Sequence, residues 1–321
     1  MANSGAKIVF GTAAIAAFPT EVGKEMLDIC EKHGVKELDT AYIYGGSEVA
    51  LNKLGAPKKF ILQTKAPLGH KLSKETVLDG MKTSLENLGV DSVDIYYLHA
   101  PDPTTPIEET LSAIQELYAA GKFKRFGLSN FRPEDVQKIY DLQAAAGSVL
   151  PSVFQGNYNA VSRHIETDLF PLLHKLKISF YAYSPIAGGF LVKSTAALRA
   201  KDDPGRFGTG SRIGDMYTSM YSKESLFQAV DEWAEIAKDA GITKAALAYR
   251  WITFHSALKR ENGDAVIVGA SKVAQLEETL GAVEQGPLDD KIAKRASDIW
   301  EKVKHEAPLD NYHSFMKDTP L

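Results

Sequence analysis

Three titratable side chains stand where short apolar segments of the sequence end: Asp39, Lys65 and His99, with Tyr42 and Tyr44 shortly after the first. A buried charge is costly unless it is paired, so we expect Asp39 and Lys65 to neutralise one another. A tyrosine beside the Lys65 ammonium would have its phenolate stabilised and its pKa lowered. His99 could orient a carbonyl oxygen by hydrogen bonding. Together these groups could protonate an oxyanion as a hydride arrives.

Each of these residues also has a simpler interpretation. Asp39 and Lys65 could form a structural ion pair, and His99 could be a buried histidine of the core. The joint arrangement favours catalysis, because three polar residues that end successive apolar strands must point into one small volume. Of the two tyrosines Tyr44 is the stronger candidate, since it precedes two glycines that let the backbone pass close to a ligand.

The elements that position these residues alternate along the chain, with short β-branched or aromatic segments followed by longer segments of helical periodicity. The predicted strands are Lys7–Thr12, Glu37–Thr40, Phe60–Lys65, Val93–His99, Arg125–Ser129, Val153–Asn157, Ser179–Ser184 and Ala265–Gly269. Several are almost wholly apolar, as expected for parallel strands that are buried on both faces.

Capping and helix-breaking residues predict the intervening helices. Helices are expected to begin at Thr20, after Ser73, at Pro106 and at Pro133, and glycines end the first three. Eight strands that alternate with helices predict a single α/β domain over residues 1–321, closed as a (β/α)8 TIM barrel with its active site at the C-terminal ends of the strands.

An open, doubly wound sheet is the alternative fold. A dinucleotide-binding domain of that type would carry G-x-G-x-x-G after its first strand. The sequence there reads Gly11-Thr12-Ala13-Ala14-Ile15, without a glycine cluster.

Two segments interrupt the alternation. Residues 187–222 are rich in Gly, Asp, Ser and Arg and predict a long loop after strand 7 that is functional or mobile. The tail from His305 to Leu321, with Tyr312 and Phe315, is expected to fold back over the barrel mouth.

The composition of the 321 residues, 44% apolar and 24% charged, is that of a globular protein with a large core. A net charge of −4 gives no reason to expect nucleic acid or an anionic membrane as a partner. Without a long apolar run, we expect a cytoplasmic protein. The lone cysteine, Cys30, reads as a buried hydrophobe, and the eight histidines lack paired ligand spacing, so no metal site is predicted.

Several motifs resemble those of the aldo-keto reductase superfamily, in family order from about residue 8 to 285. They are Leu38-Asp39-Thr40-Ala41-Tyr42-Ile43-Tyr44-Gly45-Gly46, Thr64-Lys65, Leu98-His99-Ala100-Pro101-Asp102, Gly127-Leu128-Ser129-Asn130-Phe131, Tyr181-Ala182-Tyr183-Ser184-Pro185, and Val268 to Glu278. Gly205-Arg206-Phe207-Gly208, followed by Met216-Tyr217, is similar to the aflatoxin-aldehyde reductase branch of that family.

The resemblance implies a role for each matched residue. Tyr44 would be the general acid, Lys65 and Asp39 would tune its pKa, and His99 would orient the substrate. Tyr217 is expected at the substrate site from its position in the chain alone. The residues implied for the cofactor are Asp39, Ser129, Asn130, Gln155, Tyr183, Ser184, Pro185, Ala187, Gly188, Gly189, Leu191, Lys193, Arg206, Gly269, Ala270, Ser271, Lys272, Gln275, Glu277 and Glu278. Among these, Tyr183 would stack on the nicotinamide and Arg206 would reach the 2′-phosphate.

The implied activity is NADPH-dependent reduction of aldehydes and reactive ketones to alcohols. Two arginines of the branch are absent, because Tyr217 is followed by Thr218, Ser219 and Met220 and the tail does not end in arginine. Arginine pairs strongly with carboxylates, so a preference for acidic aldehydes is not expected.

A second function class is a cofactor-binding regulatory subunit on the same scaffold, like the potassium-channel β subunits. A small carbonyl compound is the expected partner in the enzymatic interpretation, and the resemblance implies a monomer or a homodimer.

Overall fold

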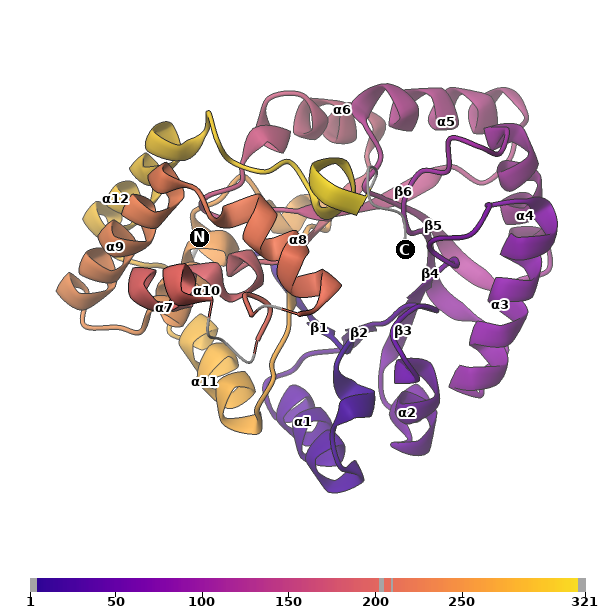
Figure 1. Ribbon diagram of the computed structural model, residues 1–321. Helices are drawn as coiled ribbons and strands as arrows, with labels where there is room; N and C mark the ends of the chain where they lie inside the picture. Colours follow the sequence, from indigo (N-terminus) through magenta and orange to yellow (C-terminus); the bar gives the residue numbers. More distant parts are fainter. Residues whose placement is uncertain (1–4, 202–204, 209, 317–321) are drawn as a thin grey trace.

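The computed structural model describes residues 5–201, 205–208 and 210–316, and eight parallel strands close into a barrel in chain order (Figure 1). The strands are β1 Lys7–Gly11, β2 Glu37–Asp39, β3 Ile61–Lys65, β4 Val93–Leu98, β5 Phe123–Ser129, β6 Pro151–Asn157, β7 Ser179–Tyr183 and β8 Ala265–Val268. The pairing of β1 with β8, with Lys7 opposite Ala265, closes the ring. The predicted TIM barrel is therefore confirmed, and the open sheet is excluded.

Helices surround the strands, and those that follow β7 enlarge one side of the molecule (Figure 1). Their bounds are α1 Thr20–Lys32, α2 Ser47–Lys53, α3 Lys74–Leu88, α4 Ile107–Ala119, α5 Pro133–Ala145, α6 Leu169–Leu176, α7 Thr195–Ala200, α8 Arg212–Tyr221, α9 Glu224–Asp239, α10 Lys244–Phe254, α11 Val273–Glu284 and α12 Asp290–Val303. Across the described ranges, none of these helices has the length and apolar character needed to cross a membrane.

The predicted helix signals act as expected. Ser73 caps α3 by accepting a hydrogen bond from the backbone of Thr76, and Gly89 ends the same helix in the left-handed conformation. Cys30 on α1 is fully buried, and burial, with a smaller contribution from Glu31, raises the pKa of its thiol to about 12. A thiol that stays protonated at neutral pH fits its interpretation as a core residue.

The alternation of side chains along each strand decides what reaches the barrel interior. Successive side chains of a strand point to opposite faces, so residues two apart share a face. Val9, Ile95, Tyr97, Val153, Tyr181, Ala265 and Ile267 pack together as a separate interior cluster. Asp39 and Lys65 lie on this same face at the C-terminal ends of β2 and β3, and Glu37 and Gln63 lie one layer below them.

Some expected boundaries were wrong. Most strands begin or end one or two residues from the predicted limits, so His99 and Ser184 follow β4 and β7 instead of ending them. Residues 187–222, which were expected to form a loop, contain the 3₁₀ segment η4 (Ala187–Val192) and the helices α7 and α8. Ser194 and Ser211 cap those two helices, so residues that suggest a loop by composition begin helices here.

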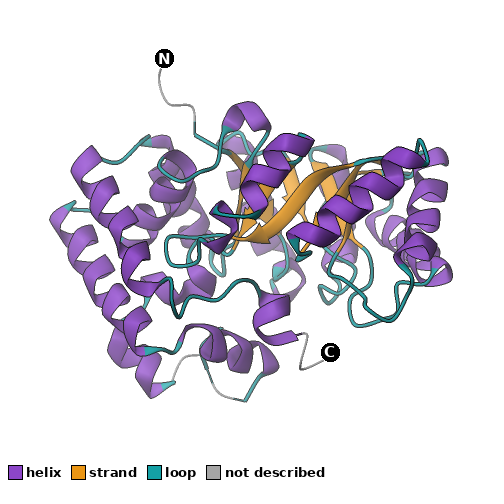
Figure 2. Cartoon of the chain, turned by 90° about the horizontal axis from the view of Figure 1, so that it is seen from above, coloured by secondary structure: helices purple, strands orange, loops and turns teal. Residues whose placement is uncertain are grey.

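The tail lies against the barrel mouth as predicted, as far as Met316; residues 317–321 lie outside the described part. Ser162 donates a hydrogen bond to the carbonyl of Pro308 at 2.6 Å, and the backbone N–H of Asn311 donates to the hydroxyl of Tyr183 at 3.4 Å. In Figure 2 the described part of the chain begins and ends on opposite sides of the strands.

Candidate active site

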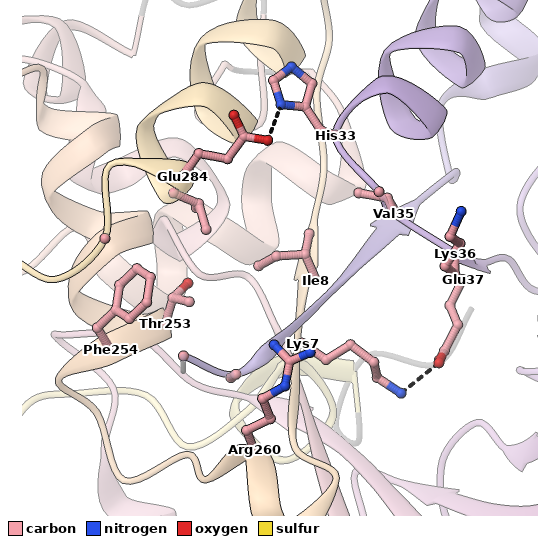
Figure 3. A pocket seen from close by; sticks show the side chains of 15 residues that line it. Lys7, Ile8, His33, Val35, Lys36, Glu37, Thr253, Phe254, Arg260 and Glu284 are labelled. Atoms are coloured by element: carbon pink, nitrogen blue, oxygen red, sulfur yellow. Dashed lines mark hydrogen bonds and ion pairs between the residues drawn. The ribbon is translucent and has the colours of Figure 1, made fainter. Parts of the chain in front are cut away.

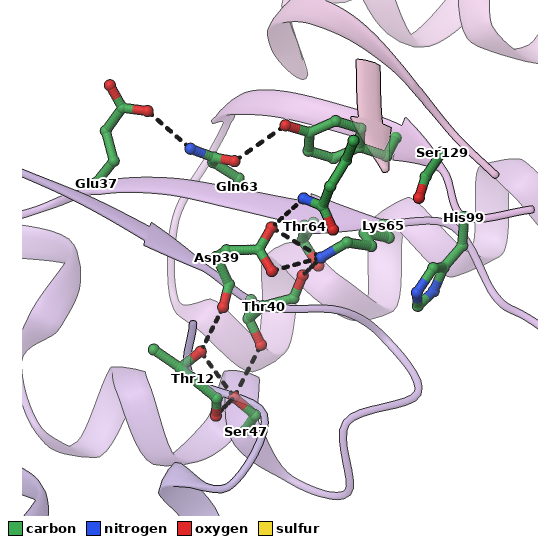
Figure 4. A network of polar contacts seen from close by, with 12 residues as sticks. Thr12, Glu37, Asp39, Thr40, Ser47, Gln63, Thr64, Lys65, His99 and Ser129 are labelled. Carbon is green, nitrogen blue, oxygen red and sulfur yellow. Dashed lines mark hydrogen bonds and ion pairs between the residues drawn. The ribbon is translucent and has the colours of Figure 1, made fainter. Parts of the chain in front are cut away.

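The buried pair of Asp39 and Lys65 forms the base of the site (Figure 4). The Lys65 ammonium donates to both carboxylate oxygens of Asp39, at 2.8 and 2.7 Å, and to the backbone carbonyl of Thr40 at 2.8 Å. Lys65 is 0% exposed and Asp39 is 3% exposed. The predicted ion pair is confirmed, and all three ammonium hydrogens have an acceptor.

Tyr44 lies above this pair, in the turn between β2 and α2. Gly46, in the left-handed conformation with a φ of 80°, lets the chain turn into α2 directly after the tyrosine. The Lys65 nitrogen is 5.1 Å from the centre of the half-buried Tyr44 ring. The His99 ring meets the same ring edge-on, with 5.9 Å between the centres. The structure therefore brings all four expected catalytic residues together.

The pKa of Tyr44 does not move in the expected net direction. Burial raises the pKa above its ordinary value of 10.0, and Asp39 raises it further, whereas Lys65 and Arg206 lower it. The expected effect of the Lys65 ammonium is present but smaller than the cost of removing a phenolate from water. In this state Tyr44 is a protonated phenol at neutral pH.

His99 is buried and neutral. Burial first, and the Lys65 charge second, lower its pKa well below 6.5. Its Nδ1 atom is buried and has no hydrogen-bond partner among the described residues. Buried polar atoms normally have partners, so this nitrogen is left unsatisfied among the described residues.

The residues expected at the nicotinamide form a connected wall. The hydroxyl of Tyr183 donates to the Asn130 side-chain oxygen at 2.7 Å, and the Asn130 nitrogen donates to the Ser129 hydroxyl at 3.1 Å. Asn130 adopts a φ of 61°, which is unusual for a residue other than glycine. Gln155 donates to Asp39 at 2.8 Å, so the wall reaches the catalytic pair.

The segment after β7 is held by Tyr217 on α8. The Tyr217 hydroxyl lies 3.2 Å from that of Ser184 and accepts a hydrogen bond from Arg206 at 3.0 Å. A Cβ atom on Gly188 would lie 2.0 Å from the Tyr217 ring. Tyr217 is buried, and its hydroxyl meets the segment expected to bind the cofactor. Its contact with substrate remains a prediction.

The other residues predicted to bind the cofactor after β7 differ in burial and backbone conformation. Pro185, Ala187 and Leu191 are buried, and Ala187, Gly188 and Gly189 all have positive φ. The backbone carbonyl of Lys193 accepts a hydrogen bond from Lys244 at 2.6 Å.

The residues after β8 are more open. Gly269, Ser271, Lys272, Gln275 and Glu278 are exposed, and Ala270 is half-buried. The Ser271 hydroxyl donates to the Gln275 side-chain oxygen at 2.8 Å.

Glu277 has a structural role in this region. It forms an ion pair with Lys32 and lies 3.3 Å from the Nε2 atom of His33, both from the end of α1. Its contribution to cofactor binding remains a prediction.

Two interior residues that were not expected at the site are Tyr97 and Gln63. The centre of the Tyr97 ring lies 5.6 Å from the Lys65 ammonium nitrogen, and the Tyr97 hydroxyl donates a hydrogen bond to the Gln63 side-chain oxygen at 3.1 Å. From the sequence alone, a tyrosine within an apolar strand is predicted to be a core residue. The spacing could have predicted their place below the site. Tyr97 is two residues before His99, and Gln63 is two residues before Lys65, so each pair shares a face of the sheet.

A pocket of about 550 Å³ opens at the other end of the barrel, beside the starts of β1 and β2 (Figure 3). Lys7, Lys36, Glu37 and Arg260 are among the residues that line it. Active sites of this fold lie at the C-terminal ends of the strands, so we do not assign the catalytic site here. The described residues contain no cluster of His, Cys, Asp and Glu that could hold a metal ion.

A closed (β/α)8 barrel with a buried Lys–Asp pair beneath a tyrosine and a neutral histidine defines a class of barrel oxidoreductases. A sequence model described as the Aldo/keto reductase family matches residues 7–301. The oxidoreductase sirO of Leptosphaeria maculans is 40% identical over 316 residues, which cover 94% of this chain and 95% of that protein. Aflatoxin B1 aldehyde reductase member 2 of Homo sapiens is 40% identical over 296 residues, 86% of this chain and 81% of that protein.

The chain belongs to the aldo/keto reductase family and is an oxidoreductase. The expected similarity to the aflatoxin-aldehyde reductase branch is confirmed. The family generally uses nicotinamide cofactors.

Proposed function

We propose that this protein reduces aldehydes and reactive ketones to alcohols with NADPH, and that Tyr44 donates the proton. The observation that carries the proposal is the geometry around Tyr44. Its ring lies 5.1 Å from a fully buried ammonium and edge-on to a neutral histidine with an unpartnered nitrogen. The names of relatives such as aflatoxin B1 aldehyde reductase support a carbonyl substrate.

The described residues fit a nicotinamide dinucleotide. Tyr183 would stack on the nicotinamide, and Ser129, Asn130 and Gln155 would bind its carboxamide. The segment from Ser184 to Lys193 would hold the pyrophosphate, and the segment from Gly269 to Glu278 would hold the adenosine. A Cβ atom on Gly269 would meet no other atom within 4 Å, so this segment leaves room for a ligand.

The cofactor would supply the hydride, and the chain itself handles the proton. The carbonyl oxygen would accept hydrogen bonds from the Tyr44 hydroxyl and from His99, which is neutral and so able to serve as an uncharged donor. As negative charge develops on that oxygen, the Tyr44 proton moves to it. The Lys65 ammonium then stabilises the phenolate that remains, until water returns the proton.

A preference for NADPH over NADH would come from the 2′-phosphate. Ser271 and Lys272 are exposed just before α11, so this part of the chain offers a hydroxyl, a cation and a helix N-terminus. Arg206 is the second candidate, although its guanidinium contacts Tyr217 in this structure.

The test is the loss of NADPH absorbance with 4-nitrobenzaldehyde, methylglyoxal and succinic semialdehyde, repeated with NADH and with Tyr44→Phe. We expect turnover with NADPH, and a loss of about 100-fold or more in kcat for Tyr44→Phe, the scale of general acid catalysis. NADPH affinity should stay nearly unchanged, because the substitution removes only a hydroxyl. Tyr42→Phe, an exposed tyrosine of the same turn, is the control. Unchanged turnover in Tyr44→Phe would reject this acid, and a chain that binds NADPH without any turnover would favour the regulatory-subunit alternative.

A further inference from the structure

The segment proposed to hold the pyrophosphate begins with a strained residue. Ser184, directly after β7, has a φ of 54°, and Ala187, three residues later, has a φ of 52°. In this left-handed region the Cβ atom of a side chain is crowded, so glycine is the residue that usually occupies it. Such a conformation persists only where the surrounding structure holds the residue in place. The contacts of Ser184 therefore determine whether the segment keeps its path out of the barrel.

Ser184 is held through both its backbone and its side chain. Its carbonyl oxygen accepts a hydrogen bond from the backbone N–H of Ala187 at 2.8 Å, which closes a turn within the segment. Its hydroxyl lies 3.2 Å from the hydroxyl of Tyr217. The same carbonyl oxygen accepts a second hydrogen bond, at 3.1 Å, from the side-chain amide of Asn159. Of these contacts, that of Asn159 ties the segment to the part of the chain that leaves β6.

Asn159 extends the pairing of β6 with β7 beyond its last residues. In that pairing Asn157 stands opposite Tyr183, and the backbone N–H of Tyr158 donates to the carbonyl of Tyr183 at 3.2 Å. One residue further along both chains, the donor to the Ser184 carbonyl is the Asn159 side chain instead of a backbone N–H. The contact between the strands is therefore carried over to the first residue of the cofactor segment.

The amide of Asn159 is itself fixed in this orientation. Asn159 is 0% exposed, and its side-chain oxygen accepts a hydrogen bond from the backbone N–H of Val161 at 3.1 Å. Because that contact assigns the oxygen to one side of the amide, the nitrogen faces Ser184. The nitrogen also lies 3.5 Å from the Asn157 side-chain oxygen and 3.5 Å from the Tyr221 hydroxyl, so the Ser184 carbonyl is the nearest of its three acceptors.

We propose that Asn159 is a positioning residue that holds Ser184 in its left-handed conformation and so aligns the segment from Ser184 to Lys193 for the pyrophosphate of the cofactor. The inference rests on the proposed function, in which that segment binds the pyrophosphate. Asn159 is fully buried, so it acts on the cofactor through the backbone of Ser184 and not by direct contact.

The experiment measures dissociation constants by calorimetric titration for NADPH and for adenosine 2′-phosphate, which carries no pyrophosphate. Asn159→Leu removes the amide and keeps a similar volume. We expect it to weaken NADPH binding by about 3- to 10-fold, the scale of one net hydrogen bond, and to leave the adenosine 2′-phosphate affinity unchanged.

Gln143→Met is the matched control. Gln143 is also buried, and its side-chain amide donates to a backbone carbonyl, that of Val149, at 2.9 Å. Val149 precedes β6, so this contact lies at the other end of that strand from the site. Neither affinity should change in this control.

The decisive measurement repeats Asn159→Leu in a chain that also carries Ser184→Gly. Glycine adopts a positive φ without the cost of a Cβ atom, so this chain does not need Asn159 to hold the conformation. Adding Asn159→Leu to Ser184→Gly should change the NADPH affinity by less than about twofold relative to Ser184→Gly alone. A general packing role of Asn159 would instead weaken NADPH binding equally in both backgrounds.

Asn159→Ala provides a second route if Asn159→Leu folds poorly, and the same pattern is expected of it. Equal weakening in both backgrounds, equal weakening of both ligands, or an unchanged NADPH affinity would overturn the inference. A wild-type chain that does not bind NADPH would instead overturn the proposed function.

Discussion

Lys65 gives all three of its ammonium hydrogens to Asp39 and Thr40, so it has none left for the Tyr44 hydroxyl. Its influence on Tyr44 therefore acts through the electric field of a buried charge 5.1 Å from the ring. Such a field is strong where water is excluded. The arrangement keeps the lysine fixed while the tyrosine gains and loses its proton.

The pKa directions predict the pH dependence of reduction. Tyr44 is the active acid only while protonated, and its pKa lies above 10.0, so kcat/KM should fall only as the pH rises through that high value. His99 has a pKa well below 6.5 and should cause no change near that pH. Initial rates from pH 6.5 to 10 should thus form a plateau. A decline centred near neutral pH would contradict these protonation states.

The sequence predicted the residues of the site better than their energetics. Asp39, Lys65 and His99 could be found because a polar residue at the end of an apolar strand is conspicuous. The net pKa of Tyr44 could not, because it depends on how much water the folded turn excludes. Tyr97 was missed because its hydroxyl bonds Gln63 on the neighbouring strand, a contact that chain order does not display.

At the scale of elements, the strands and the segment after β7 hold the site in different ways. Strand alternation places Asp39, Lys65 and Gln155 by parity, so the positions of these three side chains follow from the pattern alone. The segment from η4 to α8 instead depends on aromatic packing, since Phe190 stacks on Tyr221 and Tyr217 stacks on the same ring. Composition suggested a loop there, because its Gly and Ser residues mark helix caps as well as loops.

Gly188→Ala tests how η4 is held. Gly188 has a φ of 68°, and an added Cβ would lie 2.0 Å from the Tyr217 ring, so the contact of Tyr217 with Ser184 should break. We expect weaker NADPH binding together with a loss of stability. Gly34→Ala is the control, with a φ of 70° and no atom within 4 Å of the added carbon. The control should lose about 1 kcal/mol from its backbone conformation, with normal NADPH affinity. Equal NADPH affinity in both variants would show that Tyr217 does not order this segment.

At the scale of the whole molecule, closing the barrel removes the ion pair of Lys65 and Asp39 from water. Lys65→Met should lower the free energy of unfolding by about 3–5 kcal/mol, because the buried Asp39 carboxylate loses its partner. Asp39→Asn combined with Lys65→Met should recover part of that loss. Lys294→Met, which breaks an exposed pair with Asp298 on α12, should change stability by less than about 1 kcal/mol. Urea unfolding measures all three, and a Lys65→Met loss no larger than that of Lys294→Met would contradict this account.

The placement of the two chain ends also has a practical consequence. The described chain starts at Gly5, beside the pocket at the N-terminal end of the barrel, and its last described residues cross the mouth, where Asn311 meets Tyr183. The first and the last parts of the described chain thus lie on opposite sides of the strands (Figure 2). An affinity tag or a surface-attachment linker joined to the N-terminal side would leave the catalytic entrance accessible. The same addition at the C-terminal side would lie near that entrance and could obstruct the binding of ligands.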